Sequence, residues 1–147
     1  AFKIYVSDLG LLCAKKDLTA DDVLYETPEI NDFKGGMAEN YVNVQLSING
    51  YRTYYWQSER GAEIDFVIQR DGKLIPIEVK SGKSYKTHKA LDNFMNVPQY
   101  HIEKAYVFSV GNVETEGNVI YLPIYMCYLL KETKIGQMII DLDMTGL

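Results

Sequence analysis

The sequence of 147 residues is poor in cysteine and contains no long apolar run. Cys13 and Cys127 are the only two cysteines, too few for the disulfide framework of a small secreted protein. No stretch approaches the roughly 20 apolar residues that a membrane-spanning helix requires. These shortages argue against a small disulfide-rich secreted protein and against a helical membrane protein. We expect a cytoplasmic protein whose thiols are both reduced.

Positive charge is also scarce, because the net charge is −5. A protein that binds nucleic acid over a broad surface neutralises phosphates with Lys and Arg, so this balance argues against such binding. The segment 70–89 is the exception, with six basic and two acidic residues and a net charge of +4. We therefore expect DNA or RNA, if bound, to contact Lys80, Lys83, Lys86 and Lys89.

The composition is that of an ordinary globular protein, with 47% hydrophobic and 24% charged residues and no repeat. The length fits one domain. We expect a core over residues 36–130, an N-terminal extension over 1–35 and a tail over 131–147. The chain opens inside an apparent strand, which suggests that it is a piece of a longer protein.

Hydrophobic periodicity and turn residues predict a mixed α/β (α+β) fold. The pair Gly35-Gly36 is expected to break the chain before a helix over 37–48, where Met37, Tyr41 and Val44 recur at helical spacing. Residues 17–31 form a polar stretch in which we predict no element. We predict strands at 2–6, 51–57, 63–70, 73–80, 104–110, 119–122 and 138–142, and helical segments at 9–14, 87–96 and 123–130.

A turn at Asp71-Gly72 fixes the register of the strands on either side of it, because this dipeptide favours a two-residue type I′ hairpin. The residue numbers of each cross-strand pair then sum to 143. One face becomes wholly apolar, and the opposite face places Asp65 across from Glu78. A slip by one residue would bury both carboxylates in the core, so the register is well specified.

Asp65 and Glu78 repel each other in this register, since opposite Cβ atoms in such a pair lie about 4.5–5.5 Å apart. A divalent cation would relieve the repulsion, and Mg²⁺ or Mn²⁺ prefers hard oxygen ligands. Lys80 lies two residues beyond Glu78 and so on the same face, where it could contact an activated water or a phosphate oxygen. The pattern predicts a hydrolytic metal site.

Asp65, the run Glu78-Val79-Lys80 and the upstream helical Glu39 together resemble the PD-(D/E)XK nuclease superfamily, although Ile64 stands where its name has Pro. Most of the chain is similar to the C-terminal domain of unknown function that is attached to bacterial and archaeal AAA-type ATPases. The segments that carry this second resemblance are FKIYVSDLGLL (2–12), GMAENYV (36–42), EIDFV (63–67) and IEVKSG (77–82).

The resemblance implies a restriction-endonuclease-like αβββαβ core and an N-terminal ATPase domain, outside this sequence, that alone would bind ATP. It also implies roles for the site residues. Asp65 and Glu78 would be metal ligands and catalytic residues, Val79 would offer its carbonyl, Lys80 would assist the attacking water, and Glu39 would complete the metal shell or orient a water.

Other interpretations stay open. The domain could be a catalytically inactive accessory module of the ATPase, or a structural domain that uses its aromatic strand as an interface. Glu63 and Lys80 could form a simple cross-strand ion pair, and Glu39 could serve the helix dipole alone. Asp8 is expected to be a helix cap. The aromatic residues Tyr51, Tyr54, Tyr55 and Trp56 could stack on bases or pack within the sheet.

Overall fold

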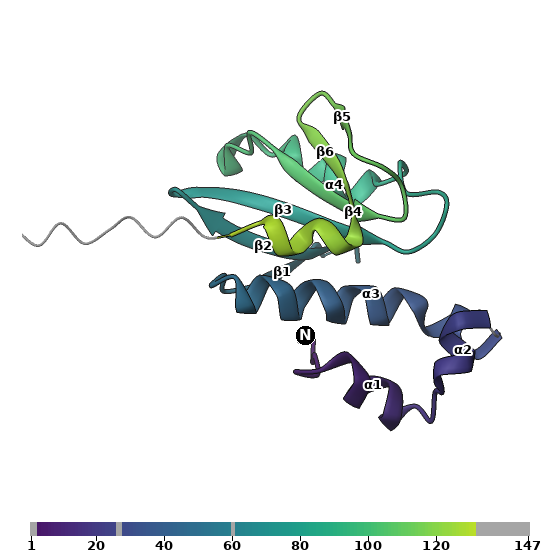
Figure 1. The fold of residues 1–147 in the computed structure, drawn as a ribbon. Coiled ribbons are helices and arrows are strands. Elements are labelled where there is room, and N and C mark those ends of the chain that lie inside the picture. The colour runs from purple at the N-terminus through teal and green to yellow at the C-terminus, as the bar shows by residue number, and fades with distance from the viewer. Residues whose placement is uncertain (1–2, 26–27, 60, 132–147) are drawn as a thin grey trace, which may run out of the picture.

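The computed structural model describes residues 3–25, 28–59 and 61–131 (Figure 1). The predicted strand at 138–142 lies outside these residues. The core elements follow the predicted order αβββαβ, from α3 to β4. The elements are α1 (Leu9–Lys15), α2 (Ala20–Tyr25), α3 (Pro28–Ile48), β1 (Tyr54–Gln57), β2 (Glu63–Arg70), β3 (Lys73–Lys80), α4 (Lys89–Met95), β4 (Ala105–Ser109), β5 (Glu114–Glu116), β6 (Val119–Pro123) and the 3₁₀ helices η1 (Pro98–Tyr100) and η2 (Ile124–Leu129).

Six strands form one mixed sheet in the order β1-β2-β3-β4-β6-β5. The first three are an antiparallel meander, whereas β3, β4 and β6 run parallel to one another, and β5 pairs antiparallel with β6. Helix α4 makes the crossover between the parallel strands β3 and β4. This mixed sheet confirms the predicted fold class, although the short edge strand β5 was not predicted.

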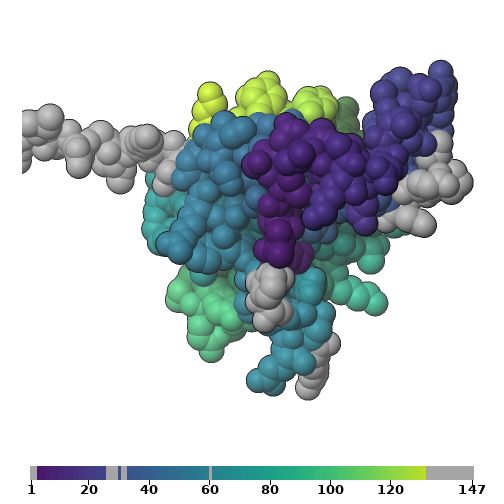
Figure 2. Space-filling model, turned by 90° about the horizontal axis from the view of Figure 1, so that it is seen from below, coloured from purple at the N-terminus to yellow at the C-terminus, as the bar shows by residue number. Residues whose placement is uncertain are grey.

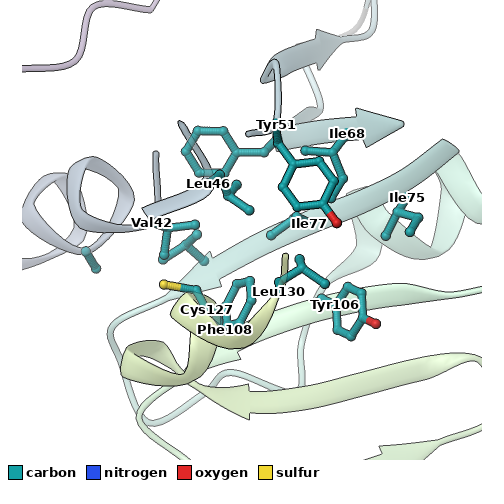
Figure 3. Close-up of a cluster of buried hydrophobic side chains, with 13 residues drawn as sticks. Val42, Leu46, Tyr51, Ile68, Ile75, Ile77, Tyr106, Phe108, Cys127 and Leu130 are labelled. Atoms are coloured by element: carbon teal, nitrogen blue, oxygen red, sulfur yellow. The ribbon is translucent and has the colours of Figure 1, made fainter. Parts of the chain in front are cut away.

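Both faces of the sheet are covered. Helices α3 and η2 pack on one face, with α1 lying outside α3, and α4 packs on the other (Figures 1 and 2). The cluster on the α3 side is the larger and includes the side chains in Figure 3. Its buried members include Val42, Leu46, Tyr51, Phe66, Ile68, Ile75, Ile77, Val79, Tyr106, Phe108 and Cys127.

Helix α3 runs through Gly35-Gly36, so the predicted break there is wrong. Each glycine costs about 1 kcal/mol relative to alanine in a helix. The apolar face of α3 begins before the pair, however, with Ile30, and continues through Ala38, Val42 and Leu46, all buried. Packing along this face outweighs the local preference, and the helix takes in part of the stretch that was expected to be irregular.

The predicted strand at 2–6 is also wrong over its described residues, since 3–6 form no regular element. Asn40 of α3 takes the place of a neighbouring strand. Its Oδ1 accepts a hydrogen bond from the Val6 N–H at 2.7 Å, and its Nδ2 donates to the Val6 carbonyl at 3.0 Å. Helix α1 follows, capped by Asp8, whose Oδ1 accepts from the Leu11 N–H at 2.8 Å as expected.

The later elements match their predictions within a few residues. Helix α4 and strands β4 and β6 are close to the predicted 87–96, 104–110 and 119–122. The predicted helical segment at 123–130 is the 3₁₀ helix η2, and Pro123 precedes it. Strand β1 is shorter than the predicted 51–57, because it begins at Tyr54. Tyr51 lies before the strand and is buried. Among the described residues, no helix combines the length and the apolar character needed to cross a membrane.

The hairpin of β2 and β3 has the predicted register from the turn as far as Phe66↔Ile77, but the predicted pair of Asp65 with Glu78 is not among its paired residues. Asp71 and Gly72 have φ values of 52° and 77°, as a type I′ turn requires. The pairs run from Arg70↔Lys73 to Phe66↔Ile77 and all sum to 143. The turn therefore sets the alignment of the two central strands.

The predicted alternation of faces fails at Asp65. Phe66 belongs to the cluster on the α3 side, but Ile64 belongs with Val67 to the cluster on the α4 side. The pairing of β1 with β2 shifts by one residue between Tyr54↔Val67 and Trp56↔Ile64, which marks a β-bulge. A bulge re-aims the side chains around it. The predicted apolar face with Ile64 beside Phe66 is therefore wrong, and Asp65 lies at the irregularity.

Candidate functional site

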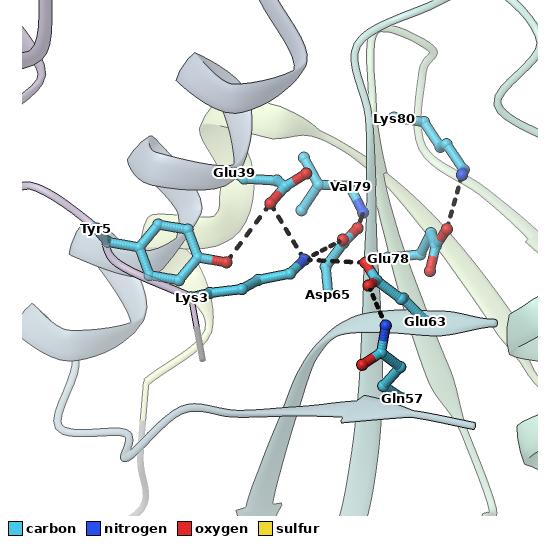
Figure 4. A network of polar contacts seen from close by, with 9 residues as sticks. All are labelled: Lys3, Tyr5, Glu39, Gln57, Glu63, Asp65, Glu78, Val79 and Lys80. Carbon is cyan, nitrogen blue, oxygen red and sulfur yellow. Dashed lines mark hydrogen bonds and ion pairs between the residues drawn. The ribbon is translucent and has the colours of Figure 1, made fainter. Parts of the chain in front are cut away.

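Asp65 lies beside Glu39, and a lysine from the N-terminal segment lies between the two (Figure 4). The Lys3 Nζ is 3.2 Å from Asp65 Oδ1, 3.4 Å from Glu39 Oε2 and 3.9 Å from Glu63 Oε2. Three elements meet here: the segment 3–6, helix α3 and the bulged strand β2. The bulge turns Asp65 toward α3, where Glu39 projects from the helix.

The second oxygen of Asp65 bonds the backbone of β3. Its Oδ2 accepts a hydrogen bond from the Val79 N–H at 2.9 Å. In a regular ladder of this register, that amide would donate to the Ile64 carbonyl. The aspartate side chain therefore satisfies a backbone donor that the bulge leaves free, which fixes the carboxylate in place.

Tyr5 completes this part of the site. Its hydroxyl donates to Glu39 Oε2 at 3.5 Å, and its ring packs on Phe66 with centroids 5.5 Å apart. Burial raises the pKa of Tyr5, and the negative charges of Glu39 and Asp65 raise it further. The hydroxyl therefore stays protonated and acts as a donor.

Glu78 and Lys80 form a separate ion pair on β3, with Lys80 Nζ 2.7 Å from Glu78 Oε1. Glu78 is 6% exposed, so the prediction of an unburied carboxylate at this position is wrong. The physical reason is that β3 has neighbours on both sides and helices on both faces, as strands in parallel sheets usually do. The other oxygen, Oε2, is buried and has no hydrogen-bond partner among the described residues.

Electrostatics connects the two groups through Asp65. Burial raises the pKa of Glu39, and the charge of Asp65 is the next cause. Burial also raises the pKa of Glu78; the hydrogen bond from Lys80 opposes this, and the charge of Asp65 adds to it. Asp65 thus lies between two carboxyl groups and disfavours the charged form of both.

The structure brings the predicted residues together only in part. Asp65 and Glu39 meet through Lys3, whereas Glu78 and Lys80 pair with each other apart from Lys3 and Glu39 (Figure 4). Within the described part of the chain, no group of three or more His, Cys, Asp or Glu side chains is arranged to hold a metal ion. Glu63 is exposed and accepts from Gln57 Nε2 at 2.8 Å, so the alternative Glu63–Lys80 pair does not form.

Two of the four predicted phosphate-binding lysines take part in internal ion pairs. Lys80 pairs with Glu78, and Lys86 pairs with Glu114 and Glu116 of β5 at 2.6 Å each. Lys83 and Lys89 are exposed. The positive character of this segment is therefore lower than its sequence indicates.

Two of the four aromatic residues proposed for base stacking pack inside the domain, and the other two line a pocket. Tyr51 is buried, and Trp56 packs edge-on against Phe94 at 5.1 Å. Tyr54 is 53% exposed. It lines a pocket of about 290 Å³ beside Asp65, which includes Lys3, Tyr5, Thr53, Tyr55 and Phe66.

Sequence reasoning missed Lys3 and Tyr5. The two residues alternate along an extended segment, which places both side chains on the same side. This alternation is the only sign in the local sequence that the two residues act together. Their position beside α3 is set by the tertiary contact of Val6 with Asn40, which the local sequence does not show. Both ring nitrogens of His88 contact other side chains. They lie 2.9 Å from Asp92 Oδ1 and 2.6 Å from the Tyr121 hydroxyl, so His88 is not placed as a ligand of this site.

These features define an α/β domain in which a meander, a crossover helix and a further parallel strand build one sheet, with a carboxylate cluster at a bulge. A family model described as "Domain of unknown function (DUF4143)" matches residues 34–127, which is more than half of the chain. The chain belongs to this family. No curated protein and no solved structure matches the chain. The matched range contains Glu39, Asp65, Glu78 and Lys80 but not Lys3.

Proposed function

We propose that this domain binds a divalent cation, Mg²⁺ or Mn²⁺, through Asp65 and Glu78, and that it binds or hydrolyses phosphodiesters of DNA or RNA there. The observation that carries the proposal is the buried Glu78 carboxylate, whose Oε2 has no hydrogen-bond partner among the described residues. A buried acceptor without a partner is costly. A cation shared with Asp65 would remove that cost.

The donor set fits such an ion. Two carboxylates and the carbonyl of Val79 are the hard oxygen ligands that Mg²⁺ and Mn²⁺ prefer, with waters completing the shell. Glu39, beside Asp65, would orient one of those waters. A bound ion would supply Lewis-acid chemistry and a water of lowered pKa. Lys80, whose side chain is 33% exposed, would contact a phosphate oxygen or the attacking water.

We further propose that the domain follows an AAA-type ATPase domain in the full-length protein, as its resemblance implies, and that it acts in the cytoplasm. The two cysteines support a reducing compartment, since Cys13 and the buried Cys127 are both free thiols. The ATPase would then bind ATP, and this domain would contact the nucleic acid.

A second candidate is a catalytically inactive accessory module. The ion pairs of the site favour it, because Lys3 contacts Asp65 and Glu39 while Lys80 pairs with Glu78. The two lysines offset two of these three negative charges without a metal ion. The net charge of −5 also weakens nucleic-acid binding.

Titration of Mn²⁺ by calorimetry tests the metal site. The test variant is Asp65→Asn, which keeps an acceptor for the Val79 N–H but removes the charge. The matched control is Asp71→Asn, because Asn-Gly also forms a type I′ turn and Asp71 is exposed. We expect wild type and the control to bind Mn²⁺, and Asp65→Asn to lose binding.

A nicking assay on supercoiled plasmid then tests turnover. Nicking by wild type with Mn²⁺, lost in Asp65→Asn and Lys80→Met, supports a nuclease. Metal binding without nicking supports the accessory module. If wild type binds Mn²⁺ no better than Asp65→Asn, the metal-site proposal is wrong.

A further inference from the structure

The ammonium of Lys3 takes the position of a cation at the carboxylate cluster. It lies within 4 Å of Asp65, Glu39 and Glu63, which come from two different elements, and it is the only lysine of the described residues in ion-pair contact with Asp65 or Glu39 (Figure 4). Burial lowers the pKa of Lys3, but the charges of Asp65 and Glu39 and the hydrogen bonds to them outweigh this effect and raise the pKa overall. The group is therefore fully charged at neutral pH.

The segment that carries Lys3 is anchored independently of the ion pairs. Val6 makes two hydrogen bonds with the side chain of Asn40, which is 2% exposed, and the Tyr5 ring packs on Phe66. These contacts fix the chain at Tyr5 and Val6, which are two and three residues after Lys3. The lysine side chain itself is 24% exposed, so it can leave the carboxylates while its backbone stays in place.

Both oxygens of Asp65 are in use. Oδ2 accepts from the Val79 N–H, and Oδ1 contacts Lys3. A metal ion that binds Asp65 must compete with one of the two. The Val79 amide belongs to the backbone of β3 and is fixed in place, whereas the Lys3 ammonium is on a partly exposed side chain and can move to solvent. Lys3 is the partner that a metal ion displaces.

We propose that Lys3 is a built-in competitor for the metal site: its ammonium offsets part of the negative charge of Asp65 and Glu39 in the metal-free protein and must leave Asp65 before a divalent ion binds. This inference rests on the proposed function, since it concerns the affinity of that same site. Lys3 lies outside the range matched by the family model, so it would set the metal affinity of this chain from beyond that range.

Calorimetric titration of Mn²⁺ into wild type, Lys3→Met and Lys3→Arg tests the proposal. We expect Lys3→Met to bind Mn²⁺ up to about fivefold more tightly than wild type, because one partly exposed ion pair no longer competes. Lys3→Arg keeps the charge and is expected to bind like wild type. The control is Lys73→Met, which removes an exposed lysine whose Nζ lies 2.6 Å from Glu103 Oε1 at the other end of the hairpin.

A second readout is the metal-induced rise in melting temperature, which is expected to be larger for Lys3→Met than for wild type. If Lys3→Met fails to fold, Lys3→Gln replaces it, because the amide keeps hydrogen bonds to the carboxylates without the charge. Loss of the gained affinity in Lys3→Met/Asp65→Asn would assign the binding to this site.

The outcomes distinguish the two proposals. Equal Mn²⁺ affinity of wild type and both neutral Lys3 variants would overturn the competitor role and leave the metal site standing. Weaker binding in the neutral variants would also overturn it, since Lys3 would then support the site. No binding by any of these proteins would overturn the proposed function together with this inference.

Discussion

Glu78→Gln is expected to stabilise the metal-free protein at neutral pH. The wild-type carboxylate is 6% exposed, with Oε2 lacking a hydrogen-bond partner among the described residues. A buried polar group left in this way costs about 1–3 kcal/mol, and a charged one costs more. Gln still leaves a polar atom at this position, but the atom is neutral and therefore less costly. The substitution also removes the pair with Lys80, which is partly exposed and is worth about 0–1 kcal/mol. The net gain is on the order of 1 kcal/mol.

The gain must depend on pH, and its sign follows from the pKa of Glu78. Burial raises this pKa in the folded state above the unfolded value. Such a group contributes stability below its unfolded pKa, about 4.3, and loses it as pH rises through the folded pKa. Wild type and Glu78→Gln should therefore be equally stable near pH 4, and the variant should gain its advantage as pH rises to 7.

Urea unfolding at several pH values measures this difference. The control is Glu103→Gln, which breaks an exposed pair with Lys73 and is expected to change stability by less than about 0.5 kcal/mol. Saturating Mn²⁺ should reverse the order at pH 7, because only wild type keeps both carboxylates. The reasoning is refuted if Glu78→Gln is less stable than wild type at pH 7. It is also refuted if the free energy of unfolding differs between the two proteins by the same amount at all pH values.

Three further substitutions test the scaffold, each by urea unfolding. Leu46→Ala should cost about 2–5 kcal/mol, because Leu46 is fully buried between α3 and the sheet; a cost below 1 kcal/mol would contradict this packing. Gly72→Ala should cost about 1 kcal/mol, since its φ is 77°, and an unchanged stability would contradict the turn. Asn40→Ala should cost about 2 kcal/mol through its two bonds with Val6, and should weaken the contact of Lys3 with Asp65.

The hairpin was the most predictable part of the molecule. Its register follows from a two-residue turn with a strong local preference, Asp71-Gly72, and the pairs from Arg70↔Lys73 to Phe66↔Ile77 have the predicted partners. The order αβββαβ was predictable for a similar reason, because hydrophobic periodicity and turn residues are local signals. The same register singled out Asp65, Glu78 and Lys80, and the family resemblance added Glu39 and the carbonyl of Val79.

The departures come from tertiary contacts. The bulge at Asp65 reverses the faces of β2, and no residue nearby in the sequence, such as a glycine, signals it. Burial of Glu78 depends on β4 and α4, which come later in the chain. Helix α3 passes Gly35-Gly36 because Ile30 packs ahead of the pair. Each of these depends on contacts between distant segments, which local propensity does not encode.

The site differs from its prediction in its source of positive charge. The sequence pointed to Lys80 as the lysine of the site, since it is two residues from Glu78 on one face. That pairing forms, at 2.7 Å. Asp65, however, is paired with Lys3, which is 62 residues away in the sequence. Each of the two proposed metal ligands is thus paired with a different lysine, Asp65 with Lys3 and Glu78 with Lys80, and a metal ion must compete with these pairs.

The central claim is that Asp65 and Glu78 share a divalent ion. The most direct measurement is an anomalous difference map from crystals grown with Mn²⁺. We predict a peak about 2.0–2.2 Å from one carboxylate oxygen of each residue, with the Lys3 ammonium moved away from Asp65. Full occupancy of Asp65 by Lys3 at saturating Mn²⁺, with no peak at these carboxylates, would contradict the account.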